Sequence, residues 1–299
     1  MKISYSALST YKQCPLQYKY SYVDKLPRKD SHHLFFGNLI HESLHEMLKG
    51  VKVKSLEEVL NYYNNNWQDK DFIASKEDPN RWLEKGSQII TNFYNSFDPK
   101  AQNVLVTEDY FKVPIIDGHE LSGIIDRLDR IKDQNGDDIL EVIDYKTGKV
   151  GSQAHIHDNL QLTIYYHAIR SRFPDIKDIR LSLYFLEPQV KQSTYRDSGH
   201  VERMQEEVVL VLNKISHQDF EPKINNLCPW CDFKEICPSY ATERIGRSWP
   251  EGDNQRRQIL EQSLPATSFK PITNTKPSPI KQSSPTKSAS TKSVQEALF

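Results

Sequence analysis

The placement of four cysteines is the strongest constraint on how this chain of 299 residues can fold. Cys228, Cys231 and Cys237 lie close together with the spacing C-x2-C-x5-C, and the only other cysteine is Cys14. Three thiols this close in sequence indicate a ligand loop, and Cys14 is the obvious fourth ligand. Four thiolates can hold a structural Zn²⁺ or a [4Fe–4S] cluster. Either group would join residue 14 to residue 237 and so close nearly the whole fold.

Composition and charge exclude several classes of protein. No apolar run reaches the roughly 18 residues of a membrane span, and residues 1–20 lack the apolar segment of a signal peptide. We therefore expect a cytoplasmic protein without a membrane partner, whose cysteines lie in a reducing compartment. The formal net charge of −1 gives no overall attraction to nucleic acids. Any affinity for DNA has to come from a local surface.

The chain divides into a body and a tail. Residues 1–250 are expected to form one folded domain, and residues 251–294 a disordered linker rich in Ser, Pro and Lys. The stretch 264–299 holds five Lys, five Pro and a single acidic residue. It has too few apolar side chains to offset the entropy of ordering, which is typical of a disordered segment.

Hydrophobic periodicity predicts an α/β domain. Helical periodicity occurs at residues 6–13, 34–49, 55–67, 79–97, 154–172 and 201–216. Strand patterns occur at residues 104–116, 121–131, 139–146 and 179–186, with a turn signal at Gln134–Asp137. We expect a mixed sheet flanked by helices, with an N-terminal helical insertion and a cysteine loop at the C-terminal end of the body.

The segment His41-Glu42-Ser43-Leu44-His45 fits the pattern H-E-x-x-H. On a helix, His41 and His45 lie one turn apart, and with Glu42 they match the zinc site of a class of peptidases. The pattern fixes only three positions, and an amphipathic helix with a buried apolar face explains the same residues. A zinc peptidase is therefore kept as an alternative, and one histidine of the pair stays available to a different metal site.

Acidic residues and a lysine concentrate in the hairpin of residues 121–146. Asp144 and Lys146 lie two residues apart in an apolar strand and therefore share a face. A buried carboxylate needs a partner; a metal ion supplies one, and Asp126 on the preceding strand is the natural second ligand. A two-residue turn would place Asp126 opposite Tyr145. We therefore predict an odd-length loop or a bulge, which brings Asp126, Asp144 and Lys146 onto one face; the alternative is a surface hairpin with ordinary salt bridges.

This arrangement suits a metal-dependent phosphodiesterase. The carboxylates would hold Mg²⁺ or Mn²⁺, which polarises the scissile phosphate and lowers the pKa of a bound water. Lys146 would orient that water or offset the charge that builds on the phosphate. A nuclease fold that binds DNA without catalysis is a further alternative, but such a module has no physical need to keep Asp126, Asp144 and Lys146 together.

The two strands of this hairpin resemble a known family. The segments G-I-I-D-R around Asp126 and I-D-Y-K-T-G around Asp144 are similar to the nuclease motifs of the PD-(D/E)xK superfamily, specifically its RecB-like branch. The resemblance implies that both aspartates are metal ligands, with the Tyr145 carbonyl as a further ligand, and that Lys146 is catalytic. Ile125 replaces the proline of the superfamily name and Asp144 the glutamate, and both departures are usual in this branch.

Two helical motifs are similar to the same branch. The segment G-N-L-I-H ending at His41 matches its histidine motif, and Gln161-Leu-Thr-Ile-Tyr165 matches its Gln-x-x-x-Tyr motif. The resemblance implies that His41 is a metal ligand. It also implies that Gln161 and Tyr165, one helical turn apart, position the substrate or the lysine. It covers roughly residues 1–245 and implies a restriction-endonuclease-like sheet.

The resemblance extends to the cysteines. Cys14 together with Cys228, Cys231 and Cys237 is similar to the iron–sulfur nuclease domains of AddB-type helicase–nucleases and CRISPR-associated exonucleases. This implies a structural [4Fe–4S] cluster, with Zn²⁺ as the alternative. The sequence contains no G-x-x-x-x-G-K-[ST] motor motif, so a helicase would be a separate partner.

The chain ends in Gln295-Glu-Ala-Leu298-Phe299, which resembles the sliding-clamp-binding peptide of bacterial replication and repair proteins. Two apolar anchors would enter a pocket on the clamp, while the linker supplies reach. Taken together, the sequence predicts a metal-dependent DNA exonuclease in repair or recombination, acting on single-stranded DNA or DNA ends. The H-E-x-x-H peptidase and the non-catalytic DNA-binding module are the alternatives.

Overall fold

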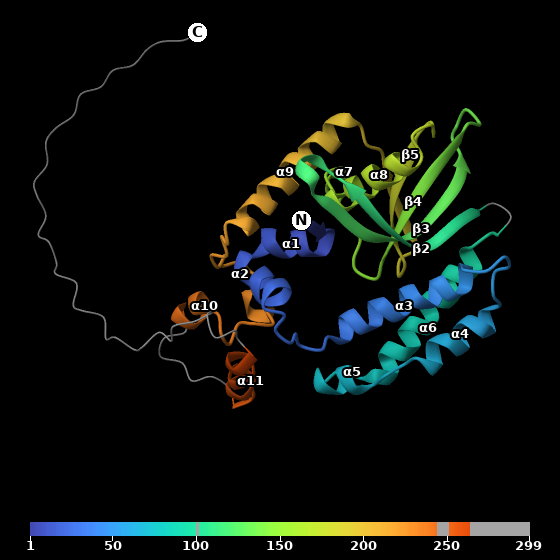
Figure 1. Ribbon diagram of the computed structural model, residues 1–299. Coiled ribbons are helices and arrows are strands. Elements are labelled where there is room, and N and C mark those ends of the chain that lie inside the picture. Colours follow the sequence, from blue (N-terminus) through green and yellow to red (C-terminus); the bar gives the residue numbers. More distant parts are fainter. Residues whose placement is uncertain (100–101, 244–250, 264–299) are drawn as a thin grey trace, which may run out of the picture. The chain divides into compact units, whose positions relative to one another are not determined.

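A six-stranded mixed sheet forms the centre of the computed structural model, which describes residues 1–99, 102–243 and 251–263 (Figure 1). Its strands are β1 (Lys2–Ser4), β2 (Asn103–Pro114), β3 (Glu120–Lys132), β4 (Asp138–Lys146), β5 (Ile179–Phe185) and β6 (Val190–Thr194). The four predicted strands are confirmed as β2 to β5. The strands β1 and β6 are only three and five residues long, too short for a recognisable alternation.

The strand β3 organises the sheet. It pairs antiparallel with β2 along residues 120–130, parallel with β1 at residues 120–122 and antiparallel with β4 at residues 127–132. Because β2 occupies one edge along nearly the whole strand, β1 and β4 share the other edge. They leave residues 123–126 between them without a strand partner on that edge. Beyond β4 follow β5, which is parallel to it, and β6, which is antiparallel to β5.

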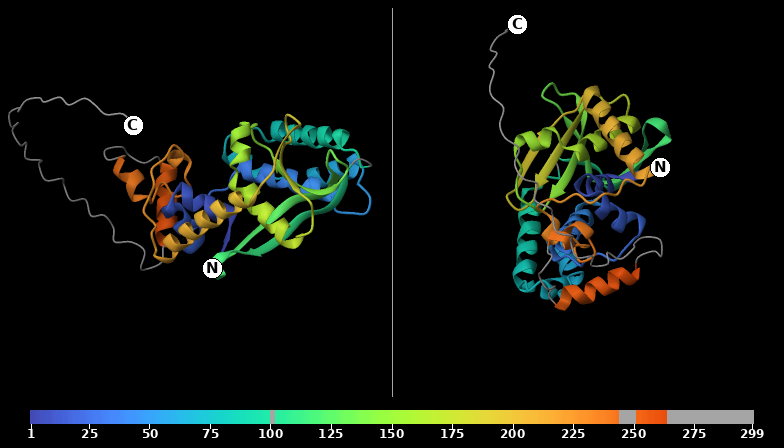
Figure 2. Two further views of the ribbon diagram at one scale, coloured as in Figure 1. Left: turned by 90° about the horizontal axis from the view of Figure 1, so that it is seen from above. Right: turned by 90° about the vertical axis from the view of Figure 1, so that its left-hand side faces the viewer.

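Helices cover both faces of the sheet (Figure 2). One face packs on α1 (Tyr5–Gln13), α8 (Leu160–Arg172) and α9 (Ser198–Ser216). The other face packs on α3 (His32–Leu48), α4 (Leu56–Asn65) and α6 (Pro79–Ser96). The alternation of β4 supports this division, since Val142 belongs to the first core and Ile143 to the second. The helices between β1 and β2 confirm the predicted N-terminal helical insertion.

The remaining helical segments are short, apart from the last one. They are α2 (Pro15–Tyr18), a π-helical turn at Lys19–Val23, α5 (Lys70–Ala74), α7 (Gln153–His157), 3-10 turns at Ile116–Gly118 and Cys228–Trp230, α10 (Pro238–Glu243) and α11 (Glu251–Ser263). No helix within the described ranges is long and apolar enough to cross a membrane.

Two expectations about the helices are wrong. The helix predicted at 154–172 is two helices, α7 and α8, because the Asn159 side chain accepts a hydrogen bond from the Leu162 amide and starts a new helix there. The linker predicted from residue 251 begins with α11 instead, a segment rich in good helix formers in which Leu260 is fully buried. Residues 264–299 lie outside the described residues.

Close packing between α6 and α4 gives a first prediction. Gly86 on α6 faces Tyr63 on α4, and a methyl group at Gly86 would lie 2.0 Å from the Tyr63 hydroxyl. An alanine normally stabilises an open helix position by about 1 kcal/mol relative to glycine. Here Gly86→Ala is expected to lower the free energy of unfolding by about 1–3 kcal/mol because it overpacks the core. Urea unfolding measures this, and a cost that is the same in a Tyr63→Phe background would contradict the explanation.

Candidate active site

The register of the β3–β4 hairpin brings the predicted carboxylates together. Its last residue pair leaves a loop of five residues, 133–137, so the predicted odd-length loop is confirmed. Continuing the observed pairing by one position places Asp126 opposite Asp144. The Tyr145 amide also donates a hydrogen bond of 2.7 Å to Oδ2 of Asp126. Both carboxylates therefore lie at the same end of the hairpin.

Side chains from α8 contact Asp144 and Lys146. The Nζ atom of Lys146 lies 2.5 Å from Oδ2 of Asp144 and donates to Oε1 of Gln161 at 3.1 Å. The Nε2 atom of Gln161 donates to Oδ1 of Asp144 at 2.9 Å. The Tyr165 hydroxyl donates to the carbonyl of Ile124 at 2.9 Å and lies 3.3 Å from the same Oδ1 atom. Four of the predicted site residues thus form one connected cluster.

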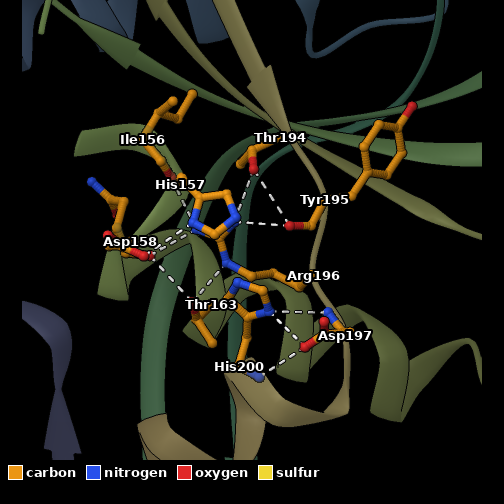
Figure 3. A network of polar contacts seen from close by, with 10 residues as sticks. Ile156, His157, Asp158, Thr163, Thr194, Tyr195, Arg196, Asp197 and His200 are labelled. Atoms are coloured by element: carbon orange, nitrogen blue, oxygen red, sulfur yellow. Dashed lines mark hydrogen bonds and ion pairs between the residues drawn. The ribbon is translucent and has the colours of Figure 1, made fainter. Parts of the chain in front are cut away.

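A buried arginine holds the start of α8 in place (Figure 3). Arg196, which follows β6, is only 6% exposed. Its guanidinium donates to the carbonyls of Ile156 and Asn159 at 3.0 and 3.2 Å and to the hydroxyl of Thr163 at 2.8 Å. These bonds fix the turn between α7 and α8, and therefore the helix that carries Gln161 and Tyr165.

A third carboxylate completes a group of possible metal ligands. Ligand atoms of His41 on α3, Glu108 on β2 and Asp126 on β3 all lie within 4.8 Å of one another. Glu108 occupies the β2 position opposite Asp126, between the pairs formed by its two neighbours. Its φ of 52° is an uncommon conformation for a glutamate, of a kind that concentrates at functional sites. Sequence reasoning missed Glu108; the signal available was its place on the same strand face as Asp126.

Burial perturbs the charges of this cluster. It raises the pKa of Asp144 more than the adjacent Lys146 lowers it. It would lower the pKa of His41, but the ion pair with Asp126, 3.4 Å away, outweighs it and the pKa is raised. Burial and the Asp126 carboxylate together raise the pKa of Glu108. Negative charge is therefore crowded into a poorly solvated place, which is an environment that favours a bound cation.

The cluster opens into a cleft of about 580 Å³. The strands β1, β2 and β3 form its floor, and α1, α3 and α8 its walls. Its lining includes His41, Glu108, Asp126, Gln161 and Tyr165. The size and mixed polar and apolar lining suit a ligand larger than a metal ion.

The H-E-x-x-H segment does not form a single metal site. His41 contacts Asp126, whereas Nδ1 of His45 lies 2.7 Å from the hydroxyl of Thr107. Within the described part of the chain, the group of possible metal ligands around His41 does not include His45. The two histidines thus have different partners, which removes the geometric basis for the peptidase alternative.

The four cysteines line one small cavity. The Lys223 amide lies 3.5 Å from Sγ of Cys14, and the Asn225 amide lies 3.3 Å from Sγ of Cys228. Burial, followed by the nearby Cys14 and Cys237, raises the pKa of the Cys231 thiol to about 11. The structure therefore brings Cys14 to the C-terminal cysteine loop. The predicted clamp-binding residues 295–299 lie outside the described residues.

Comparison with known proteins gives matches over most of the body. A sequence model of the PD-(D/E)XK nuclease superfamily matches residues 2–238. The B-type component of the ATP-dependent helicase/deoxyribonuclease from three Streptococcus agalactiae strains is 27% identical over 155 residues, which are 49% of this chain and 14% of that component. The chain thus corresponds to a small part of these relatives.

Among solved structures, a candidate exonuclease from Eubacterium rectale matches with a TM-score of 0.46 and 9% identity, over 85% of this chain and 92% of that one. The superfamily match spans the histidine helix, the acidic hairpin, α8 and the cysteine loop. The mixed sheet flanked by helices agrees with the fold that this superfamily implies. This chain belongs to the PD-(D/E)XK nuclease superfamily.

Proposed function

We propose that this protein is a Mg²⁺- or Mn²⁺-dependent DNA exonuclease that acts on single-stranded DNA or DNA ends in repair or recombination. One observation carries the proposal. The ligand group of His41, Glu108 and Asp126 lies next to the ion-paired Asp144 and Lys146. Membership of a nuclease superfamily supports the reaction class, and the connected geometry argues against a DNA-binding module without catalysis.

The donor set fits the proposed metal. Carboxylate oxygens suit Mg²⁺ and Mn²⁺, and an imidazole suits a transition metal such as Mn²⁺. The Oδ2 atom of Asp144 is buried and accepts no hydrogen bond from the described residues, so a ligand position is available there. We propose that His41, Asp126 and Asp144 hold the ion, with Glu108 and the Tyr145 carbonyl as further ligands. When bound, the metal would polarise the phosphate and supply a hydroxide near neutral pH.

The protein's own side chains would position the substrate and stabilise charge. Lys146 is held between the Asp144 carboxylate and the Gln161 amide, so its ammonium group has a fixed direction. A preorganised cation at this point would offset the negative charge that develops on the phosphate. Gln161 and Tyr165 would act as positioning residues, since both contact Oδ1 of Asp144.

The second prediction tests the reaction and the lysine together. Purified protein with Mg²⁺ or Mn²⁺ is expected to degrade end-labelled single-stranded DNA, and a chelator should stop the reaction. Lys146→Ala is expected to lower kcat by about 100-fold or more because it removes charge stabilisation in the transition state. Lys149→Ala, which changes an exposed lysine three residues further along, is the matched control. Full activity of Lys146→Ala, or activity in excess chelator, would refute the proposed mechanism.

We also propose a structural [4Fe–4S] cluster at Cys14, Cys228, Cys231 and Cys237. Around one tetrahedral Zn²⁺, with Zn–S bonds of about 2.3 Å, the sulfurs would lie about 4 Å apart. Within the described residues no three of the four sulfurs come within 4.8 Å of one another, so the spacing favours the larger group. The amides near the Cys14 and Cys228 sulfurs are of the kind that tunes such clusters.

The third prediction concerns this cluster. Anaerobically purified protein is expected to contain about four iron atoms and about four sulfides per chain. Cys231→Ser should lose both and unfold at a lower temperature, since the link between residues 14 and 237 restricts the unfolded chain. Stoichiometric zinc without iron would show that the four thiols hold Zn²⁺ instead.

Two partners belong to the proposal. The relatives are components of helicase/deoxyribonucleases, which supports a separate helicase as a partner. The terminal Gln295, Leu298 and Phe299 would bind a bacterial sliding clamp, with residues 264–294 as the tether. A clamp contact would bring the nuclease to replicating or repaired DNA.

The fourth prediction isolates the clamp contact. Deleting residues 295–299 is expected to abolish binding to the clamp in surface plasmon resonance, because both apolar anchors are lost. Activity on free DNA should stay unchanged, since the deletion does not touch the body. A full-length protein that fails to bind, or a truncated one that binds equally well, would refute this contact.

A further inference from the structure

We infer that an exposed strip of residues beside the metal ligands is a subsite for one nucleotide of single-stranded DNA. The strip consists of Lys2 on β1, Tyr110 and Lys112 on β2, and Ile124 on β3. The Tyr110 ring would stack on an unpaired base, and the two lysines would contact the adjoining phosphates. This inference rests on the proposed nuclease function and adds the substrate class and the residues that select it.

The strip is a direct continuation of the metal site along the sheet. Tyr110 pairs with Ile124, and each lies two residues from a proposed ligand, Glu108 on β2 and Asp126 on β3. Side chains two residues apart share a face and are about 6.8 Å apart along a strand. Lys2, Tyr110 and Ile124 line the same cleft as Glu108 and Asp126. A strand of nucleic acid crossing the metal site would therefore reach the tyrosine one step later.

Unusual exposure marks Tyr110. Among the tyrosines that the structure describes, only Tyr110, at 51%, and Tyr195, at 46%, are exposed. By contrast Tyr11, Tyr18 and Tyr20, which follow one another near the first cysteine, are buried. Ile124 beside Tyr110 is 47% exposed. An exposed aromatic ring next to an exposed isoleucine inside a cleft offers an apolar platform, and such platforms typically bind a ligand.

Charge around Tyr110 favours a polyanion. Nζ of Lys2 donates to the Tyr110 hydroxyl at 2.6 Å and lies 5.3 Å from its ring centre. Hydrogen bonding to Lys2 and the fields of Lys2 and Lys112 lower the pKa of Tyr110. Both lysines are exposed, so they are available to phosphates. The net charge of the chain is near zero, and this local pair provides the contact that the overall charge does not.

A single strand fits the strip better than a duplex. The face of a base is free for stacking on a side chain only when the base has left its neighbours in the helix. Aromatic platforms flanked by cations are the usual way in which proteins bind single strands without reading sequence. No hydrogen-bonding group of the strip is placed as a bidentate reader of base edges. The subsite would therefore accept any base, as an enzyme that degrades DNA ends requires.

The test separates base stacking from phosphate contact. The substrates are an end-labelled oligo-dT and the same oligonucleotide with abasic sites in place of the terminal bases. On oligo-dT with Mn²⁺, Tyr110→Ala is expected to raise KM by about 10- to 100-fold, the usual effect of losing one stacked base, with little change in kcat. Tyr110→Phe keeps the ring and should restore KM to near the wild-type value. Tyr195→Ala, at the far edge of the sheet after β6, is the matched control and should change neither constant.

The abasic oligonucleotide gives the decisive comparison. Wild type and Tyr110→Ala should have equal KM values on it because it has no base to stack, whereas Lys2→Gln should weaken both substrates. An unchanged KM for Tyr110→Ala on oligo-dT, or an equal loss on the abasic oligonucleotide, would overturn the subsite. Fluorescence anisotropy of the labelled oligo-dT without metal measures the same ratios as Kd. Unchanged Kd values there would overturn the subsite even if no DNA is cleaved, whereas absent cleavage with normal Tyr110-dependent binding would refute only the nuclease.

Discussion

The pairing of β3 with β4 is the constraint on which the rest of the site depends. A shift of one residue would turn Asp126 to the opposite face from Asp144 and Lys146. The five-residue loop sets the observed register, and the contacts on the two faces of the sheet reinforce it. On one face Asp144 meets Lys146 and Gln161. A slipped hairpin would bury that carboxylate without these partners, at a large cost in free energy.

The opposite face supports the same register with a second polar cluster. Arg127, next to Asp126, is 2% exposed and forms a buried ion pair with Asp129. Its guanidinium also lies 3.5 Å from the hydroxyl of Tyr145, which follows Asp144. Each proposed ligand on the hairpin thus has a neighbour that is fixed on the back of the sheet. A buried arginine is stable only when its partners are in place, so the two clusters favour one hairpin register and disfavour its alternatives.

The sequence predicted the long elements of the fold and most of the site. Helices such as α3 and α6 and strands such as β4 have enough residues for a clear period, and their motifs name His41, Asp126, Asp144 and Lys146. Glu108 was missed because its alignment with Asp126 depends on the β2–β3 connection. That connection contains Asp117 with a φ of 60°, and its length in the ladder is not readable from hydrophobicity. The short strand β1 escaped because three residues carry no periodicity.

The short strand β1 shows how the two ends of the body meet at the cleft. It occupies the edge of β3 that β4 leaves free, and residues 123–126 lie between the two strands. In this interval the Ile124 carbonyl accepts a hydrogen bond from Tyr165, so backbone that would extend a sheet elsewhere contributes to the site. The chain then runs from β1 through α1 to Cys14. The Tyr11 hydroxyl on α1 donates to the Asp219 carbonyl at 2.5 Å, and the Cys14 sulfur lies near the Lys223 amide.

These contacts connect the wall of the cleft to the cysteine loop. Lys2 and Tyr5 line the cleft, and both belong to the segment that Cys14 ends. A group bound by the four thiols would therefore hold in place the N-terminal segment on which the cleft depends, although it lies at the other end of α1. In this arrangement a structural cofactor supports substrate binding through the backbone of β1 and α1 and does not have to take part in the chemistry.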